Sequence, residues 1–345
     1  MNFDITKILR PNLVNFKPYS SARDEYSGAN AIFLDANENP FESGLNRYPD
    51  PYQKELKKVI AGIKEIEASK IFLGNGSDEP IDLLYRAFCE PGIDNVVSIK
   101  PTYGMYKVCA DINNVTYREV YLTPSYQLDV DAVLNKITGQ TKLIFICSPN
   151  NPTSNCLLTD DIIRLVKNVN CLVVLDEAYI DFSSNESLLK QLNNYPNLVI
   201  LQTFSKAWGM AGIRLGMAFA SEEIVRILSH IKYPYNINVL TQREALNHLQ
   251  NTGRKDEEVA LILKERDVLQ AELQQLKYVE NILPSDANFL MIKVNEPRRL
   301  LEYLVKKLII IRDRSKVSLC EGYVRITIGS PTENHKLVDA LKAFK

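Results

Sequence analysis

Histidine is scarce in this 345-residue chain, and its three histidines lie far apart. There is no HExxH segment and no Cys/His pair at metal-ligand spacing, so we expect no protein-held metal. CxxC pairs are also missing, and several cysteines lie in apolar runs typical of strands. We therefore expect buried free thiols rather than disulfides. The cysteines are Cys89, Cys109, Cys147, Cys156, Cys171 and Cys320.

The chain also lacks an excess of positive or negative charge, because it contains 41 Lys and Arg residues and 42 Asp and Glu residues. This balance argues against nucleic-acid binding and against a general attraction to membranes. The longest apolar runs, such as Cys171–Leu175 and Leu308–Ile311, are far shorter than the ~18 residues that span a bilayer. The opening segment MNFDITKILRPNLVNF has no apolar signal core, which favours a cytoplasmic location.

The composition is that of a globular protein, and the length suggests about two domains at ~150 residues each. Residues 1–45, which contain several prolines, predict an N-terminal arm that packs with the small domain. Residues 46–240 predict a large domain in which short β-rich runs alternate with helical patterns. Such alternation favours an α/β fold with a mostly parallel sheet covered by helices on both faces. The expected strands are Ile71–Leu73, Asn95–Ile99, Thr116–Tyr121, Lys142–Cys147, Cys171–Leu175, Leu198–Gln202 and Leu215–Phe219.

The pattern changes after this region, and residues 241–345 predict a smaller α+β domain. One long helix, about Thr241–Leu276, is expected to link the two domains. Shorter elements follow it, including strands near Asn288–Val294, Ile309–Arg312 and Tyr323–Ile328.

Polar residues follow the expected strands of the large domain at their carboxyl ends, where open parallel sheets bind ligands. They form the segments GNGSDE (74–79), SPNNPT (148–153), DEAY (176–179) and TFSK (203–206), and Arg214 comes soon after. Each segment alone is ordinary: a capped helix start, a turn, an N-cap or a solvated lysine. GNGSDE lacks the third glycine of a dinucleotide site and the GK[ST] of a P-loop. The joint occurrence at one sheet edge is what indicates a site.

These residue types are those that an aromatic aldehyde cofactor with a phosphate and a ring nitrogen requires. A lysine bonds the aldehyde, and a carboxylate keeps the ring nitrogen protonated. Helix-start N–H groups, a serine and an arginine hold the phosphate. Pyridoxal 5'-phosphate meets the whole requirement.

The segments SPNNPT, LDEAY and TFSKAWGMAGIRLG resemble the fold-type I, pyridoxal-phosphate-dependent aminotransferases of class I and II, and the resemblance covers nearly the whole chain. One departure is Ser154, where that family usually has glycine. The resemblance implies that Lys206 bonds the cofactor and moves the proton, and that Asp176 pairs with the ring nitrogen. It further implies that Asn151 and Tyr179 bond the ring hydroxyl and that Tyr103 stacks on the ring. The residues implied at the phosphate end are Gly76, Ser77, Asp78, Ser205 and Arg214.

Further segments resemble the histidinol-phosphate aminotransferases within that family: PYSSAR (18–23), LDANENP (34–40), NRYPDP (46–51), IIIRDR (309–314) and VRITIG (324–329). The resemblance implies a homodimer, in which Tyr48 reaches the cofactor phosphate of the neighbouring subunit. It places Tyr19, Asn37, Arg312 and Arg325 at the substrate end.

The activity implied is transfer of the amino group of L-histidinol phosphate to 2-oxoglutarate, in histidine biosynthesis. It gives imidazole-acetol phosphate and L-glutamate. Two enzymes that share the cofactor residues remain as alternatives, an aromatic amino acid aminotransferase and a threonine-phosphate decarboxylase. A ligand sensor without catalysis is a further alternative, but the chain has no basic segment for the DNA-binding module of such regulators.

Overall fold

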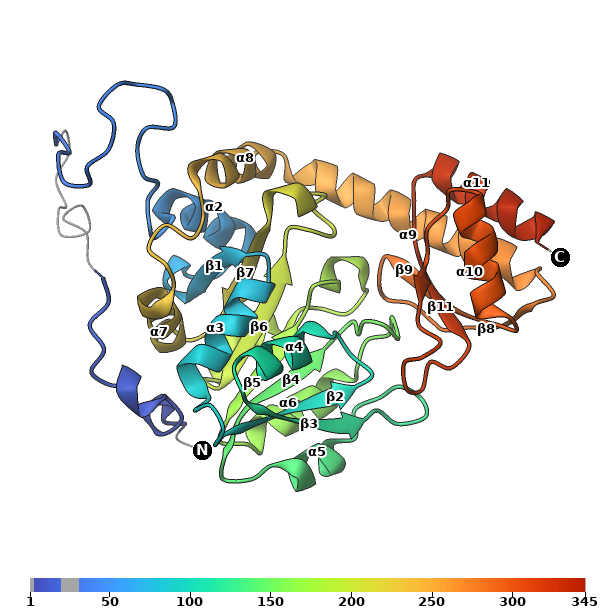
Figure 1. Ribbon diagram of the computed structural model, residues 1–345, viewed down its shortest axis with the longest axis horizontal. Helices are drawn as coiled ribbons and strands as arrows, with labels where there is room; N and C mark the ends of the chain where they lie inside the picture. The colour runs from blue at the N-terminus through green and yellow to red at the C-terminus, as the bar shows by residue number, and fades with distance from the viewer. Residues whose placement is uncertain (1–2, 20–30, 345) are drawn as a thin grey trace.

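The computed structural model describes residues 3–19 and 31–344, and its main feature is a seven-stranded sheet (Figure 1). The strand order is β1-β7-β6-β5-β4-β2-β3. Strands β2 to β6 pair in parallel, whereas β7 lies antiparallel between β1 and β6. The short link from β6 to β7 holds no crossover helix, which a parallel connection would need. The strands are β1 (Ile71–Asn75), β2 (Asn95–Lys100), β3 (Thr116–Tyr121), β4 (Thr141–Cys147), β5 (Leu172–Asp176), β6 (Leu198–Thr203) and β7 (Leu215–Phe219).

Helices cover both faces of this sheet, as the alternating pattern predicts. Along β4, Leu143 and Phe145 join one buried cluster, while Ile144 and Ile146 join the other. Both faces of the sheet are covered and shielded from water, so the strand is apolar at successive positions. Helices α3 (Asp78–Phe88), α4 (Met105–Ile112) and α7 (Glu222–Ile231) pack on the first face. Helices α2 (Lys54–Lys64), α5 (Val130–Lys136), α6 (Thr159–Lys167) and α8 (Val239–Leu249) pack on the second. Short 3₁₀ turns are η3 (Ala68–Lys70), η4 (Ile180–Phe182), η5 (Leu188–Asn194) and η6 (Ala211–Ile213).

The second sheet is antiparallel, with the order β10-β11-β9-β8, and it has its own core. Its strands are β8 (Val279–Ile282), β9 (Phe289–Val294), β10 (Arg312–Asp313) and β11 (Tyr323–Thr327). Helices α9 (Thr252–Gln274), α10 (Pro297–Lys306) and α11 (Pro331–Ala343) accompany it. Figure 1 shows α9 running from the large sheet to this smaller one.

The single long helix expected at Thr241–Leu276 is in fact two helices. Helix α8 ends at Leu249, and α9 begins at Thr252. The side chain of Asn251 caps α9 by accepting a hydrogen bond from the backbone N–H of Arg254. A side-chain cap supplies the acceptor that the first turn of a new helix lacks, so the break occurs at this residue.

The N-terminal arm differs from the expectation that it packs with the small domain. Its turns η1 (Ile5–Lys7) and η2 (Pro11–Leu13) lie on the large domain instead. Ile5 and Ile8 are buried in the cluster beneath α3, and the N–H of Arg10 donates to the carbonyl of Ala87 at 3.0 Å. Burial of these two apolar side chains stabilises the arm's first turns against the large domain. Residues 31–50 then form a loop that stands off the body and rejoins it just before α2 (Figure 1).

Five of the six cysteines are buried, Cys156 is partly buried, and all six are free thiols. Among the helices of residues 3–19 and 31–344, none has the length and apolar character needed to cross a membrane.

Candidate active site

A cavity of about 140 Å³ lies at the carboxyl ends of the large-sheet strands, and it gathers the residues that the sequence places there. Side chains reach it from the ends of β1, β4, β5 and β6 and from the start of β7. Ten of the eleven predicted cofactor residues line it: Gly76, Ser77, Asp78, Tyr103, Asn151, Asp176, Tyr179, Ser205, Lys206 and Arg214. Cys147, Ala178, Thr203 and Ala211 complete the wall.

Asp176, the last residue of β5, is the buried acid of this cavity, with 3% of its surface exposed. The hydroxyl of Tyr106 donates a hydrogen bond to Oδ2 at 2.6 Å, and the N–H of Ala178 donates one to Oδ1 at 3.0 Å. Burial raises the pKa of Asp176, whereas these two hydrogen bonds lower it. A buried carboxylate of this kind fits a cationic ring nitrogen, because a positive partner offsets the cost of its burial.

Lys206 presents its amine to the same cavity, with Nζ 5.7 Å from the centre of the Tyr179 ring. Loss of hydration lowers the pKa of Lys206, and the positive charge of Arg325 lowers it further. No hydrogen bond or ion pair holds this amine within the part of the chain that the structure describes. A lysine with a lowered pKa is available as a neutral nucleophile.

The start of α3 forms a tight cup beside Arg214. Gly76 has φ of +68°, and a Cβ there would lie 2.7 Å from Nη2 of Arg214. Across the cup, a Cβ on Gly216 would lie 2.3 Å from the backbone nitrogen of Ser77. Only glycine therefore permits this approach, and it leaves backbone N–H groups, a serine and a guanidinium at one helix start. This donor set suits a phosphate, so the residues present fit pyridoxal phosphate at both ends.

Asn151 and Tyr179 connect this cavity to the small domain. Nη1 of Arg325 on β11 donates to Oδ1 of Asn151 at 2.6 Å. The ring of Tyr179 packs edge-on against Phe289 on β9, with 5.2 Å between the ring centres. Burial raises the pKa of Tyr179, and the charge of Arg325 lowers it. Two residues of the small sheet therefore contact the cavity wall at Asn151 and Tyr179.

The remaining predicted residues do not line the cavity. Tyr48 is half-exposed and stacks on Tyr235, with 4.4 Å between the ring centres. Tyr19, Asn37 and Arg312 are exposed. Tyr19 and Asn37 belong to the N-terminal arm and Tyr48 follows it directly, and none of the three lines the cavity of its own chain. Residues 20–23 of the PYSSAR segment lie outside the described residues.

Sequence reasoning missed two contributors. Tyr106 lies one helical turn after Tyr103 in KPTYGMY, and this spacing is the signal that could have placed it beside the cavity. Asp286 carried no local signal. It accepts a hydrogen bond from the N–H of Cys156 at 2.7 Å, next to the loop that bears Asn151.

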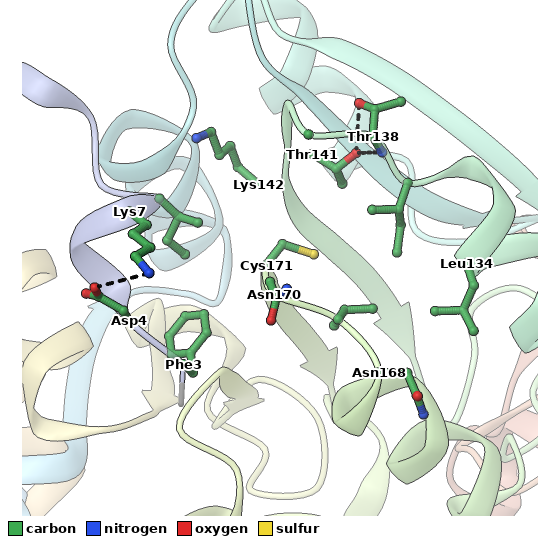
Figure 2. A pocket seen from close by; sticks show the side chains of 14 residues that line it. Phe3, Asp4, Lys7, Leu134, Thr138, Thr141, Lys142, Asn168, Asn170 and Cys171 are labelled. Atoms are coloured by element: carbon green, nitrogen blue, oxygen red, sulfur yellow. Dashed lines mark hydrogen bonds and ion pairs between the residues drawn. The ribbon is translucent and has the colours of Figure 1, made fainter. Parts of the chain in front are cut away.

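A larger cavity, of about 890 Å³, lies at the opposite edge of the sheet, near the amino ends of β4 and β5 (Figure 2). Its rim carries a loose pair of exposed side chains, Lys7 and Asp4, 3.9 Å apart. None of the predicted catalytic, cofactor or substrate residues lines it. Chemistry rather than size therefore identifies the smaller cavity as the candidate active site.

Comparisons with known proteins show what this chain is similar to. Residues 29–341 match the family model described as aminotransferase class I and II. A histidinol-phosphate aminotransferase of Cytophaga hutchinsonii is 53% identical over 348 residues, covering 100% of both chains. One of Parabacteroides distasonis is 53% identical over 342 residues, covering 99% of each. The crystal structure of the histidinol-phosphate aminotransferase from Clostridium acetobutylicum has a TM-score of 0.80 at 27% identity, covering 87% of this chain and 90% of that one.

Proposed function

The chain belongs to the class I and II aminotransferase family, and on this premise we propose that it is a histidinol-phosphate aminotransferase that uses pyridoxal 5'-phosphate. The reaction moves the amino group of L-histidinol phosphate to 2-oxoglutarate, a step of histidine biosynthesis. The observation that carries the proposal is one cavity that joins Lys206, Asp176 and the glycine cup, in a chain 53% identical over its full length to a protein of that name.

When bound, the cofactor would supply an aldehyde that accepts the amino group from the donor and a ring that accepts electrons from the substrate. Asp176 would hold the proton on the ring nitrogen, and its effect would be greatest when negative charge develops. Tyr103 would cover the ring, while Asn151 and Tyr179 would bond its hydroxyl. Ser77, Ser205 and Arg214 would hold the phosphate. The amine of Lys206 would take a proton from the substrate carbon that bears the nitrogen and later return it.

The substrate end must accept a phosphate in one half-reaction and a carboxylate in the other. Histidinol phosphate has no carboxylate, whereas glutamate has two. Guanidinium groups bind both anions through paired hydrogen bonds, which an ammonium group does not. Arg325 and Arg312 supply this chemistry, and Tyr19 and Asn37 add polar contacts from the arm.

The proposal includes a homodimer, in which Tyr48 of one subunit serves the cofactor phosphate of the other. Support comes from the arm, where Ile32, Leu34 and Phe41 are each at least 79% exposed. Apolar side chains exposed together on one segment favour contact with another protein surface. Tyr48 does not line the cavity of its own chain, and a second copy of the chain would give it a cofactor site to serve.

The test is a purified-protein assay with a panel of amino donors. We expect glutamate from 2-oxoglutarate with histidinol phosphate, and a visible cofactor band that bleaches when this donor is added alone. Equal use of dephosphorylated histidinol or of aromatic amino acids would favour the aromatic aminotransferase. Carbon dioxide release from threonine phosphate would favour the decarboxylase. Absence of turnover with every donor, despite a bound cofactor, would favour a sensor.

A further inference from the structure

Three arginines share one face of the small sheet. Arg312 on β10 lies directly opposite Arg325 on β11, and the N–H of Arg314 donates to the carbonyl of Tyr323, which continues the ladder by two residues. Side chains alternate along a strand, so Arg312, Arg314 and Arg325 point to the same side. Tyr323 and Phe289 on this side join the large-domain cluster. The face therefore turns toward the active site rather than toward the small domain's core.

Like charges in this arrangement are unfavourable unless an anion joins them. Burial lowers the pKa of Arg314, and the nearby charges of Arg325 and Arg312 lower it further. Nε of Arg314 is buried without a hydrogen-bond partner. The adjacent carboxylate, Asp313, lies across from Val324 and accepts hydrogen bonds from Ser315 instead. Within the described residues Arg314 forms no ion pair, and no Asp or Glu is among the groups that shift its pKa.

The cluster borders the cavity through Arg325. Its Nη1 lies 2.6 Å from Oδ1 of Asn151, and its guanidinium carbon lies 5.1 Å from the centre of the Phe289 ring. Tyr179, a cavity residue, is close enough to Arg314 for the charge of Arg314 to lower the pKa of Tyr179. Arg314 therefore lies behind Arg325 as seen from the cofactor site, where the far end of a substrate must fit.

We propose that Arg314 is a specificity-determining residue, which completes with Arg312 and Arg325 a three-guanidinium site for the doubly charged phosphate of the amino donor. The inference rests on the proposed function for the identity of that donor. A dianion gains more than a carboxylate from a third positive charge, and it has three oxygens to engage the unpartnered N–H groups. The buried N–H of Arg314 gains a partner only when such a ligand is present.

The test compares Arg314→Gln with Lys316→Gln, a matched loss of one exposed positive charge two residues away. We expect Arg314→Gln to lower kcat/KM for histidinol phosphate by about 10- to 150-fold, mainly through KM, and kcat/KM for glutamate by less than half as much on a logarithmic scale. Lys316→Gln should change neither. Arg314→Lys keeps the charge without the planar fork and should restore activity in part. Equal losses for both donors would overturn the inference.

The pH dependence of donor preference distinguishes phosphate binding by Arg314 from a purely structural role of that residue. The second pKa of a phosphate ester is about 6, so the dianion is lost below that pH. In wild type, the ratio of kcat/KM for histidinol phosphate to that for glutamate should fall from pH 8 to 5. The fall should be shallower in Arg314→Gln, because the dianion loses its extra partner. An identical pH dependence in both proteins would contradict the assignment.

Calorimetric binding of inorganic phosphate to the holoenzyme, with acetate as a monoanionic comparison, separates this inference from the proposed function. We expect Arg314→Gln to weaken phosphate binding at least tenfold and acetate binding less. If the enzyme rejects histidinol phosphate but phosphate binding still depends on Arg314, the function is wrong and the site stands. If transfer proceeds while wild type and variant bind phosphate equally, the site is wrong and the function stands.

Discussion

Among the single residues, Asp176 shows how hydrogen bonds stabilise the ionised form of a buried carboxylate. Its burial disfavours the ionised form, and one hydroxyl and one backbone N–H oppose that effect. Tyr106, the hydroxyl donor, is itself fully buried and has its ring stacked on Phe145, which fixes its position. Tyr106 therefore acts as a positioning residue that keeps Asp176 ready for a cationic ring.

We expect Tyr106→Phe to destabilise the apoprotein more at pH 8 than at pH 4.5. Burial places the pKa of Asp176 in the folded state above its unfolded value, so stability falls as pH rises through that pKa. The Tyr106 hydrogen bond limits the fall because it stabilises the ionised carboxylate. Its loss should cost about 1.5–3 kcal/mol at pH 8 and less at pH 4.5. Urea unfolding of the cofactor-free protein at both pH values measures the difference.

Tyr85→Phe is the matched control for that experiment. Tyr85 is also fully buried, but its hydroxyl donates to the backbone carbonyl of Tyr106, which does not titrate. Its loss should therefore cost the same at both pH values. If the two variants showed the same pH dependence, Tyr106 would have no special effect on Asp176.

We expect Lys206→Ala to fold and to bind pyridoxal phosphate without a covalent link. The amine is the only cavity nucleophile with a lowered pKa among the described residues, since burial raises the pKa of Cys147 and of Tyr179. Borohydride treatment followed by mass spectrometry should label wild type and leave the variant unlabelled. A cofactor still fixed to the variant would show that another residue forms the bond.

At the scale of elements, the loop between β4 and α6 ties the cavity to the small domain. Ser154 on this loop is fully buried with φ of +67°, and its Oγ donates to the carbonyl of Pro284 at 3.1 Å. The N–H of Asp286 donates to the carbonyl of Ser154 at 2.8 Å. Serine in place of the family's usual glycine thus adds a contact between the domains, but it also puts a residue with a Cβ in the unfavourable left-handed conformation.

We expect Ser154→Ala to be less stable than Ser154→Gly. Both variants lose the hydrogen bond to Pro284, but only alanine keeps the unfavourable left-handed conformation of a residue with a Cβ. The difference should be about 1 kcal/mol in the free energy of unfolding. Denaturant unfolding of the two variants beside wild type measures it. A more stable alanine variant would show that the loop changes its backbone when the serine is replaced.

For the molecule as a whole, the position of Tyr48 raises the question whether one chain or two make a site. Tyr48 stacks on Tyr235 and lies apart from the residues that line its own cavity. If Tyr48 serves a partner, a hybrid of two damaged chains contains one undamaged site. Complementation therefore tests both the dimer and the role of the arm.

We expect activity to recover when subunits of Lys206→Ala exchange with subunits of Tyr48→Phe. One site of each hybrid then has an intact Lys206 on its own chain and an intact Tyr48 from the other. Activity should exceed the sum of the two parents, given a clear loss in Tyr48→Phe alone. Exchange of Lys206→Ala with Asp176→Ala is the control, because both residues line one cavity and no hybrid site is intact. Proven hybrids without recovery would argue that Tyr48 acts within its own chain.

The amino-acid sequence was enough to predict the large sheet and ten of the fourteen residues that line the cavity. The reason is local, because apolar runs define parallel strands and the residues after each strand must meet at one edge. For the same reason, Asp176 and Lys206 were assigned without knowledge of what lies beside them.

Contacts between segments distant in sequence could be seen only in the folded chain. They include the Tyr106–Asp176 hydrogen bond, the contact of Ser154 with Pro284, and the shared face of Arg314 and Arg325. The antiparallel placement of β7 and the docking of Ile5 on the large domain belong with them. The sequence near these residues carries no pattern that predicts such contacts. Each contact depends on how separate elements pack together and on which buried polar groups then find hydrogen-bond partners.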